Sequence, residues 1–297
     1  MTSVNEVVRQ VQLRLSQAKI DSPAAEAAMI ISHVVGVSRG KLGVMQALGE
    51  HLDSATVERI VDLVDQRAKR IPLQHLTGET TFYGVDLKIE PCVFRPRVET
   101  EVLVETTLED FEVTTGELKI LDLCTGSGAI AAALADQFGR RSVPTRIWAV
   151  ELDPTAAELA RHNTRDYNVT VLCADATNTA AVIGADPELA TLLGTFDAVV
   201  SNPPYIPTAT PVTQTEAEQD PSLALYGGSS DGLAVPLRVV DQAARWLAPH
   251  GFFMMEHDHT HAAELAAMMR QSSTWHKVHT IRDLTDTDRF VSALRAE

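Results

Sequence analysis

The stretch "DLCTGSGAI", residues 122–130, decides the fold of this chain. It overlaps the apolar run "KILDLC", typical of a short buried strand, and leads into "GAIAAALADQF", a run of small residues typical of a helix. Gly126 and Gly128 allow a tight turn at this point and let a ligand approach the backbone. The turn fits the pattern G-x-G-x-x-A of many dinucleotide-binding folds, and a tight turn without a ligand is the alternative interpretation.

Six further apolar runs read as strands, and most of them alternate with helical segments. The predicted strands are "RIWAVEL", "VTVLCAD", "FDAVV", "GFFMME", "HKVHTIRDL" and "RFVSAL". Strands that alternate with helices form a parallel sheet covered by helices. The last two strands are separated only by the turn "TDTD", and so short a turn joins only antiparallel neighbours. The sequence therefore predicts an α/β fold with a seven-stranded, mostly parallel sheet in which one terminal strand runs against the others.

The first part of the chain has a different pattern. Apolar residues recur at helical spacing from Val4 to Leu15, and further helical segments follow. We therefore predict a helical domain over residues 1–75, a linker with a β-hairpin over 76–98, and the sheet-containing domain over 99–297.

The charge of the chain is unevenly distributed. The net charge is −15, but residues 1–78 hold nine Lys and Arg against eight Asp and Glu, whereas residues 79–297 hold 16 against 32. So acidic a domain repels a phosphate backbone, and autonomous nucleic-acid binding is therefore not expected. This domain would attract a partner with a basic surface. The simplest interpretation, however, is that the excess of carboxylates keeps the protein soluble.

Cysteine use and hydropathy narrow the class of protein. Cys92, Cys124 and Cys173 are odd in number and lack CxxC spacing, which argues against a disulfide framework or a zinc site. The first residues do not resemble a signal peptide, and no apolar run reaches the length that spans a membrane. We therefore expect a cytoplasmic protein without a membrane partner.

Carboxylates follow the second and third predicted strands. Glu151 lies 23 residues after Gly128, about the offset at which an acidic residue binds ribose hydroxyls, and Asp175 ends "VTVLCAD". Parallel sheets bind ligands at the carboxyl ends of their strands, so both residues are candidates for cofactor binding. The alternatives are a surface carboxylate for Glu151 and a helix cap for Asp175.

The fourth strand runs into "SNPPYIP", residues 201–207. Two prolines fix the backbone there and leave Asn202 little freedom. An immobilised amide oxygen and a neighbouring carbonyl can accept both N–H bonds of a planar NH2 group and aim its nitrogen at a methyl group. Tyr205 offers a flat face to the same group. This corner favours S-adenosyl-L-methionine as cofactor over a nicotinamide dinucleotide, for which it has no evident use.

With these motifs in hand, the chain closely resembles the glutamine-N5 methyltransferases of class I peptide-chain release factors, the HemK or PrmC family. The residues that carry the resemblance are "IDSPAAEAAMIISHVVGVSR", "IPLQHLTGETTFYGVDLKIEPCVFRPRVETE", "DLCTGSGAIAAALA", "AVELDPTAAELARHN", "SNPPYIP" and "DPSLALYGGSSDGL", in that order. The resemblance implies a Rossmann-like class I methyltransferase domain behind a helical recognition domain. It also implies S-adenosyl-L-methionine as donor, S-adenosyl-L-homocysteine as product, and the glutamine of a release factor's Gly-Gly-Gln motif as acceptor.

The resemblance also assigns roles to particular positions. Residues 124–128 would hold the methionine part of the donor, Glu151 its ribose, and Asp175 the adenine side. The cofactor-binding candidates are Asp122, Cys124, Thr125, Gly126, Ser127, Gly128, Glu151, Asp175 and Asn202. The catalytic candidates, which would also bind the glutamine, are Asn202, Pro203, Pro204 and Tyr205, and Arg97 is a further substrate-binding candidate.

Some positions depart from the family pattern or remain open. Cys124 replaces a common Gly, Val98 a common Pro, and Ala176 a bulkier residue. The segment "EHDHTH", residues 256–261, holds three histidines and two acids, but we interpret it as a solvated loop and expect no metal site. Arg97 and its neighbour Arg95 either contact substrate or pair with the acidic helix that contains Glu99, Glu101 and Glu105.

Two other functions use similar residues. An amino methyltransferase of nucleic acid, acting on adenine N6 or guanine N2, shares the Asn-Pro-Pro-Tyr chemistry, but the acidic domain argues against it. A non-catalytic module that binds the cofactor and pairs with translation factors would keep the pocket without turnover.

Overall fold

The computed structural model describes residues 1–114, 116–210 and 220–297. The chain forms two compact units, which divide after Thr80. No helix in these described ranges is long and apolar enough to cross a membrane.

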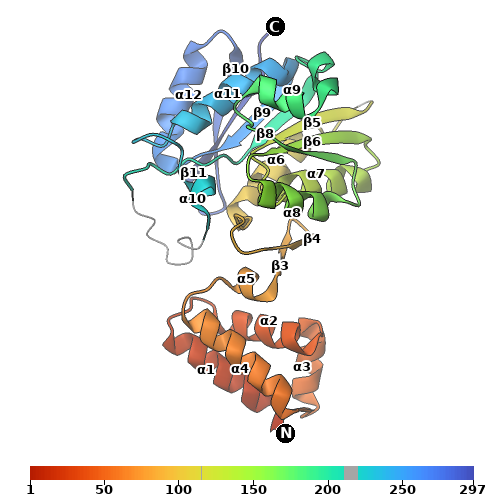
Figure 1. Ribbon diagram of the computed structural model, residues 1–297, viewed down its shortest axis with the longest axis vertical. Helices are drawn as coiled ribbons and strands as arrows, with labels where there is room; N and C mark the ends of the chain where they lie inside the picture. The colour runs from red at the N-terminus through yellow and green to blue at the C-terminus, as the bar shows by residue number, and fades with distance from the viewer. Residues whose placement is uncertain (115, 211–219) are drawn as a thin grey trace. The chain divides into compact units, whose positions relative to one another are not determined.

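The first unit is a helical bundle, drawn in red and orange in Figure 1. Its helices are α1 (Val4–Gln17), α2 (Pro23–Val35), α3 (Arg39–Ala47), α4 (Ser54–Ala68) and α5 (Leu73–Thr77), and β1 (Thr2–Ser3) pairs antiparallel with β2 (His51–Leu52). The predicted apolar face of α1 is buried, and Gly36 ends α2 in the left-handed conformation. Arg67 of α4 donates to Glu26 of α2 across 2.6 Å, which joins the two helices.

A hairpin and a short helix connect to the sheet of the second unit. The hairpin consists of β3 (Glu79–Phe82) and β4 (Val85–Lys88), with Gly84 at φ +80° in its turn. A 3-10 turn, η1 (Val98–Thr100), then leads into α6 (Glu101–Asp110). The hairpin lies within residues 76–98, where the sequence predicts one.

The sheet of the second unit has seven strands in the order β10-β11-β9-β8-β5-β6-β7. Their bounds are β5 (Leu118–Leu123), β6 (Thr145–Glu151), β7 (Val169–Cys173), β8 (Phe196–Ser201), β9 (Leu247–Glu256), β10 (Trp275–Arg282) and β11 (Asp288–Arg295). Strand β11 runs antiparallel to both of its neighbours, β9 and β10, while β5, β6, β7, β8 and β9 pair in parallel. The predicted fold class is confirmed.

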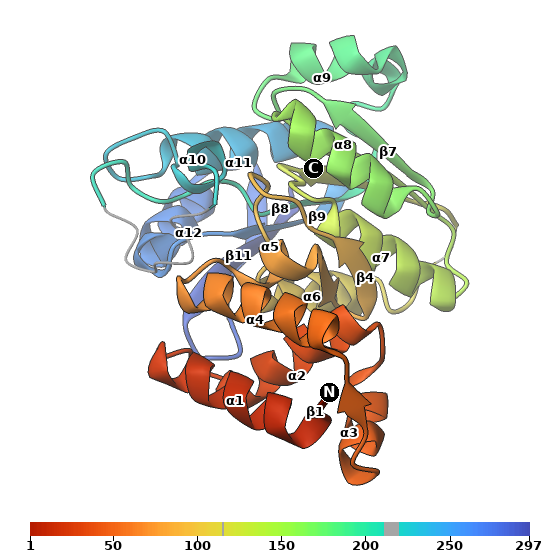
Figure 2. The same cartoon turned by 60° about the horizontal axis from the view of Figure 1, so that its bottom comes forward.

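Helices cover both faces of this sheet, as Figures 1 and 2 show. One face packs against α6, α7 (Ala129–Arg140) and α8 (Pro154–Thr164), and the other against α11 (Ala234–Trp246) and α12 (Ala262–Gln271). Along β5, Leu121 and Leu123 belong to one apolar core, whereas Ile120 belongs to the other. Because both faces are buried, the central strands are apolar throughout, and polar residues appear only near their ends.

The remaining short elements lie near the carboxyl edge of the sheet or at its β7 side. They are α9 (Thr179–Ala185), η2 (Pro187–Thr191), α10 (Ser222–Leu225) and η4 (His259–His261). The sequence pattern did not predict α9 or α10, which are only seven and four residues long.

Candidate active site

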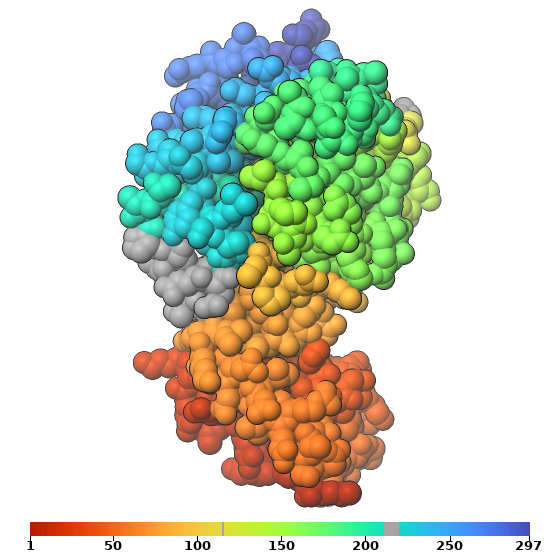
Figure 3. All heavy atoms as spheres, viewed as in Figure 1, coloured from red at the N-terminus to blue at the C-terminus, as the bar shows by residue number. Residues whose placement is uncertain are grey.

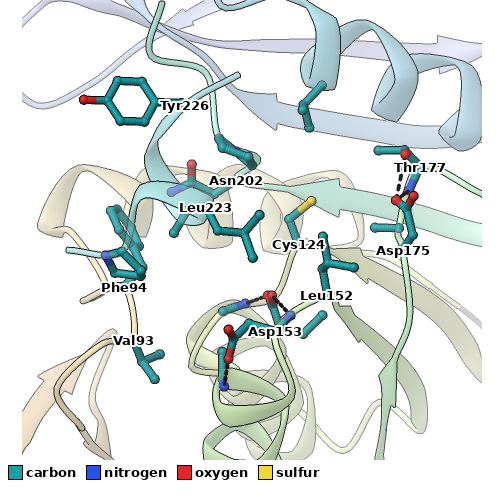
Figure 4. A pocket seen from close by; sticks show the side chains of 18 of the residues that line it. Val93, Phe94, Cys124, Leu152, Asp153, Asp175, Thr177, Asn202, Leu223 and Tyr226 are labelled. Carbon is teal, nitrogen blue, oxygen red and sulfur yellow. Dashed lines mark hydrogen bonds between the residues drawn. The ribbon is translucent and has the colours of Figure 1, made fainter. Parts of the chain in front are cut away.

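A cavity of about 300 Å³ lies at the carboxyl edge of the parallel strands. Its walls come from the ends of β5, β6, β7 and β8, from the starts of α8 and α11, from the loop residues 92–94, and from residues 221–228, which include α10. Figure 3 shows the yellow-green surface of the β6–α8 region facing the cyan surface near α10 across a groove. In Figure 4, Asp175 and Thr177 lie at one end of the cavity and Tyr226 near the other, with Cys124 and Asn202 between them.

The glycine turn forms the floor of this cavity. Gly126 lines it at φ +57°, and a Cβ built there would meet no atom within 4 Å. Gly128, at φ +80°, serves packing instead, since a Cβ there would lie 3.1 Å from the Cα atom of Ala160 in α8. Cys124 also takes a left-handed conformation, φ +62°, which explains physically why a glycine suits this position.

Glu151 is held in place by the backbone of the turn. Its Oε2 atom accepts from the Gly126 amide at 2.8 Å, and its Oε1 atom accepts from the Asp153 amide at 2.9 Å. Burial raises the pKa of Glu151, and these two amides partly oppose the rise. A carboxylate has about four lone-pair positions, so both oxygens keep acceptor capacity for hydroxyl groups in the cavity. Glu151 is therefore a fixed acceptor and not a mobile surface carboxylate.

Asp122 and Thr125 form a buried pair beneath the turn. The Thr125 hydroxyl donates to Asp122 Oδ2 at 2.5 Å, while the buried Oδ1 atom has no hydrogen-bond partner among the described residues. Burial raises the pKa of Asp122 to about 7, although the Thr125 hydroxyl opposes the rise. Neither residue lines the cavity, so the pair supports the glycine turn from beneath.

Asp175 lines the cavity beyond the end of β7. Its Oδ1 atom accepts from both the amide and the hydroxyl of Thr177, at 2.9 and 2.7 Å. The following helix, α9, is capped by Asn178, so the interpretation of Asp175 as its cap is wrong. The neighbouring Ala176 is buried and also lines the cavity.

The Asn-Pro-Pro-Tyr corner directly follows β8. Asn202 and Pro204 line the cavity, and Pro203 is buried. Asn202 donates from Nδ2 to the Thr100 hydroxyl at 3.2 Å. Tyr205 does not belong to the cavity lining, and its hydroxyl donates to Glu256 at 2.9 Å. The aromatic rings that do line the cavity are those of Phe94 and Tyr226.

The segment "LALYGGSSDGL" packs backbone to backbone against this corner. The amides of Tyr205 and Ile206 both donate to the Leu225 carbonyl, at 3.2 and 2.8 Å. A Cβ at Gly232 would collide with the Tyr205 carbonyl oxygen, and a Cβ at Gly227 would collide with the Gly232 carbonyl. Close approach to the corner therefore requires a glycine at position 232, and the fold of the segment on itself requires one at position 227.

Arg95 and Arg97 share one carboxylate, Asp220. Arg95 donates to its two oxygens at 3.1 and 3.2 Å, and Arg97 donates to Oδ2 at 2.7 Å. The Asp220 side chain is fully buried. The sequence left two possible partners for these arginines, the substrate and the acidic helix that contains Glu101. The carboxylate that both arginines contact is Asp220, which precedes α10 and does not belong to that helix, so the acidic helix is the wrong partner for these contacts.

The interpretation of "EHDHTH" as a solvated loop is also wrong. Glu256, His257 and His261 are all buried, and His261 Nε2 lies 2.7 Å from the Asp231 carbonyl oxygen. Among the described residues, no group of three or more His, Cys, Asp or Glu is arranged to hold a metal ion.

Sequence reasoning missed Thr100, Glu256 and Asp220. Glu256 ends the strand "GFFMME" at the same edge as Glu151, so its position was a usable signal. Thr100 ends the 3-10 turn η1 and Asp220 lies outside helices and strands, and no local pattern marks either residue as part of a site.

Comparison with known proteins agrees with this geometry. Residues 6–78 match the family model described as the PrmC N-terminal domain, and residues 120–214 match that of a methyltransferase domain. A methyltransferase of known structure from Pyrococcus furiosus is 20% identical, with a TM-score of 0.50 over 78% of this chain and all of the other, which supports the fold alone.

Two curated relatives are similar over nearly their whole length. The release factor glutamine methyltransferase of Bifidobacterium longum is 36% identical over 98% of this chain and 99% of its own. That of Mycolicibacterium smegmatis is 38% identical over 99% of both chains. The sheet topology, the cavity at the strand ends and these two full-length similarities lead to one conclusion: the chain belongs to the family of release factor glutamine methyltransferases, which depend on S-adenosylmethionine.

Proposed function

We propose that this protein methylates the side-chain amide nitrogen, N5, of the glutamine in the Gly-Gly-Gln motif of class I peptide chain release factors. The donor is S-adenosyl-L-methionine and the product S-adenosyl-L-homocysteine. The observation that carries the proposal is the position of Asn202, which lines the cavity while its Nδ2 atom is engaged by Thr100. Its amide oxygen is therefore the atom left to accept from a substrate amide.

The residues around the cavity suit the donor. When bound, S-adenosyl-L-methionine supplies an electrophilic methyl group on a sulfonium. Glu151 would accept from its ribose hydroxyls, residues 124–128 and Asp122 would hold its amino-acid part, and Asp175 would face the adenine side. The open side of Gly126, which lines the cavity, supports this fit. The Cys124 side chain narrows the floor of the cavity but leaves it open.

The corner would orient the substrate glutamine. The Asn202 side-chain oxygen and an adjacent backbone carbonyl would accept the two N–H bonds of the glutamine amide, while Pro203 and Pro204 keep the backbone rigid. Acceptors favour the transition state because the attacking nitrogen becomes more positive there. Tyr226 or Phe94 would provide the flat face that we expected from Tyr205, since both rings line the cavity. Arg97 would act through Asp220 by shaping the cavity wall.

The helical domain over residues 1–75 would recognise the release factor, and 99–297 would form the catalytic domain. The match of residues 6–78 to a domain specific to this family supports that role. The strongly acidic second part of the chain disfavours a nucleic-acid substrate. The protein would encounter its release factor substrate in the cytoplasm.

Mass spectrometry tests the proposal. The purified protein is incubated with S-adenosyl-L-methionine and a release factor, and the Gly-Gly-Gln peptide should gain one methyl group on glutamine. Methylation of nucleic acid alone would contradict the proposal. The Asn202→Ala variant should lose turnover but still bind the donor, whereas a non-catalytic binding module would show no turnover in either form.

A further inference from the structure

A chain of buried hydrogen bonds runs from Asn202 to a carboxylate outside the cavity lining. Asn202 Nδ2 lies 3.2 Å from Thr100 Oγ1, and the Thr100 hydroxyl donates to Glu256 Oε2 at 2.7 Å. The Tyr205 hydroxyl donates to the other carboxylate oxygen, Oε1, at 2.9 Å. Thr100 is 3% exposed and Glu256 is 2% exposed, so the bond between them is shielded from water. These hydrogen bonds connect Asn202 and Tyr205, the two polar residues of the Asn-Pro-Pro-Tyr corner, to the buried carboxylate of Glu256.

The Glu256 carboxylate fixes which group donates and which accepts in this series of hydrogen bonds. An ionised carboxylate only accepts hydrogen bonds, so both hydroxyls must donate to Glu256. Thr100 has one hydroxyl proton, and once that proton points at Glu256 the oxygen can only accept from Asn202. Asn202 must then present its NH2 group to Thr100. Burial raises the pKa of Glu256, whereas the hydrogen bonds from Thr100 and Tyr205 and the positive charge of Arg289 oppose this rise and favour the ionised form that this arrangement needs.

The opposite orientation of the Asn202 amide is therefore unfavourable. A rotation by 180° would place two oxygens, Asn202 Oδ1 and Thr100 Oγ1, against each other without a proton between them. Leaving such a buried pair unsatisfied is strongly disfavoured. The rotated amide would also present NH2 to the NH2 of a glutamine substrate, so two donors would meet.

We propose that Thr100 and Glu256 are positioning residues that set the orientation of the Asn202 amide, so that its oxygen faces the substrate. The inference rests on the proposed function, because it concerns how Asn202 meets the substrate amide. Glu256 acts through Thr100 and contacts neither donor nor substrate.

Two substitutions test this direction in different ways. Thr100→Val removes the hydroxyl that holds Asn202, whereas Thr100→Ser keeps it. Glu256→Gln keeps the shape but introduces a donor. The arrangement that satisfies every group then places the Gln amide against Thr100 and the Gln oxygen against Tyr205, so that Thr100 donates to Asn202 Oδ1 and the Asn202 amide is reversed.

The experiment measures kcat and KM for a release factor, the dissociation constant of S-adenosyl-L-methionine by calorimetry, and Tm. We expect kcat to fall about 10- to 100-fold in Thr100→Val and Glu256→Gln, with donor affinity unchanged. Thr100→Ser should keep a kcat close to that of the unmodified protein. Thr107→Val is a matched control, because Thr107 is equally buried but its hydroxyl bonds only the Leu103 carbonyl within α6. This control should leave kcat unchanged.

A second readout does not depend on turnover. In protein labelled with 15N at asparagine, the Asn202 side-chain NH2 signals, identified by their loss in Asn202→Ala, should shift in Thr100→Val and Glu256→Gln but not in Thr107→Val. An unchanged kcat in both Thr100→Val and Glu256→Gln, or a Thr100→Ser variant as impaired as Thr100→Val, overturns the inference. Should Thr100→Val fail to fold, Glu256→Gln, which preserves shape, decides the question. If Asn202→Ala itself retains turnover, the proposed function fails instead.

Discussion

Arg95 and Asp220 form a buried ion pair in which two guanidinium nitrogens, Nε and Nη2, contact the two carboxylate oxygens separately. Arg95 immediately follows Phe94, and Asp220 immediately precedes Pro221, and both of these neighbours line the cavity. The pair therefore joins two segments that line the cavity, residues 92–94 and residues 221–228. Asp220 also accepts from Arg97, so its removal would break the contacts of two guanidinium groups with one buried carboxylate.

Asp220→Ala should consequently lower the free energy of unfolding by about 3–5 kcal/mol and weaken donor binding. Chemical denaturation and calorimetry with S-adenosyl-L-methionine measure the two effects. Glu188→Ala breaks the exposed pair of Glu188 with Arg146 in the same unit and serves as the control, with little change expected in either quantity. Equal effects of the two substitutions would contradict a role of Asp220 in the wall.

Gly232→Ala should displace the backbone of the Asn-Pro-Pro-Tyr corner at Tyr205. Gly232 has φ +81°, and a Cβ there would collide with the Tyr205 carbonyl oxygen, so we expect a loss of stability above about 1 kcal/mol together with a lower kcat. Gly139→Ala is the matched control, because Gly139 lies in α7 with nothing within 4 Å of its Cβ position. That substitution should stabilise the protein by about 0.5–1 kcal/mol. A normal kcat in Gly232→Ala would show that the corner tolerates displacement.

The three thiols should differ in reactivity. Burial raises the pKa of the Cys124 thiol, and the carboxylates of Glu151 and Asp122 raise it further, whereas Cys92 and Cys173 are exposed. Because the thiolate is the reactive form, iodoacetamide at pH 8 should alkylate Cys92 and Cys173 well before Cys124. Peptide mapping by mass spectrometry follows the order. Early alkylation of Cys124 would mean that the floor of the cavity is more polar and open than described.

Stability should depend on pH through Asp122. Its pKa is about 7 in the folded protein against a usual value of 3.8, so between these values the folded state binds more protons than the unfolded state. Stability contributed by this group is therefore lost as pH rises from about 4 to 7, by at most about 1.4 kcal/mol per pH unit. Asp122→Asn should remove the pH-dependent contribution of this carboxyl group. The free energy of unfolding of the variant, minus that of the unmodified protein, should therefore increase from pH 4 to 7 and stay constant above pH 7. A difference independent of pH would contradict the assignment.

Much of this fold follows from local sequence. The glycine turn, the apolar strands and the proline corner are each encoded within a few residues, because tight turns and buried strands need particular residue types. The positions of Glu151 and Asp175 at the sheet edge follow from the same pattern.

The supporting contacts do not follow from local sequence. Thr100 and Glu256 are 156 positions apart and meet only because α6 and β9 are neighbours in the folded unit. Tyr205 was expected in the cavity, but its hydroxyl has a buried carboxylate as partner and turns away. Pairings of this kind depend on tertiary packing, which composition and periodicity do not specify.

The place of β11 in the sheet has a consequence for biosynthesis. This strand lies between β9 and β10, both of which leave the ribosome before it, and it pairs Phe290 with Glu256. Until β11 emerges, β9 lacks the neighbour whose Phe290 pairs with Glu256, the carboxylate that anchors the Asn-Pro-Pro-Tyr corner. We therefore expect the Asn-Pro-Pro-Tyr corner, whose Tyr205 hydroxyl bonds Glu256, to become competent for catalysis only after β11 has paired with β9.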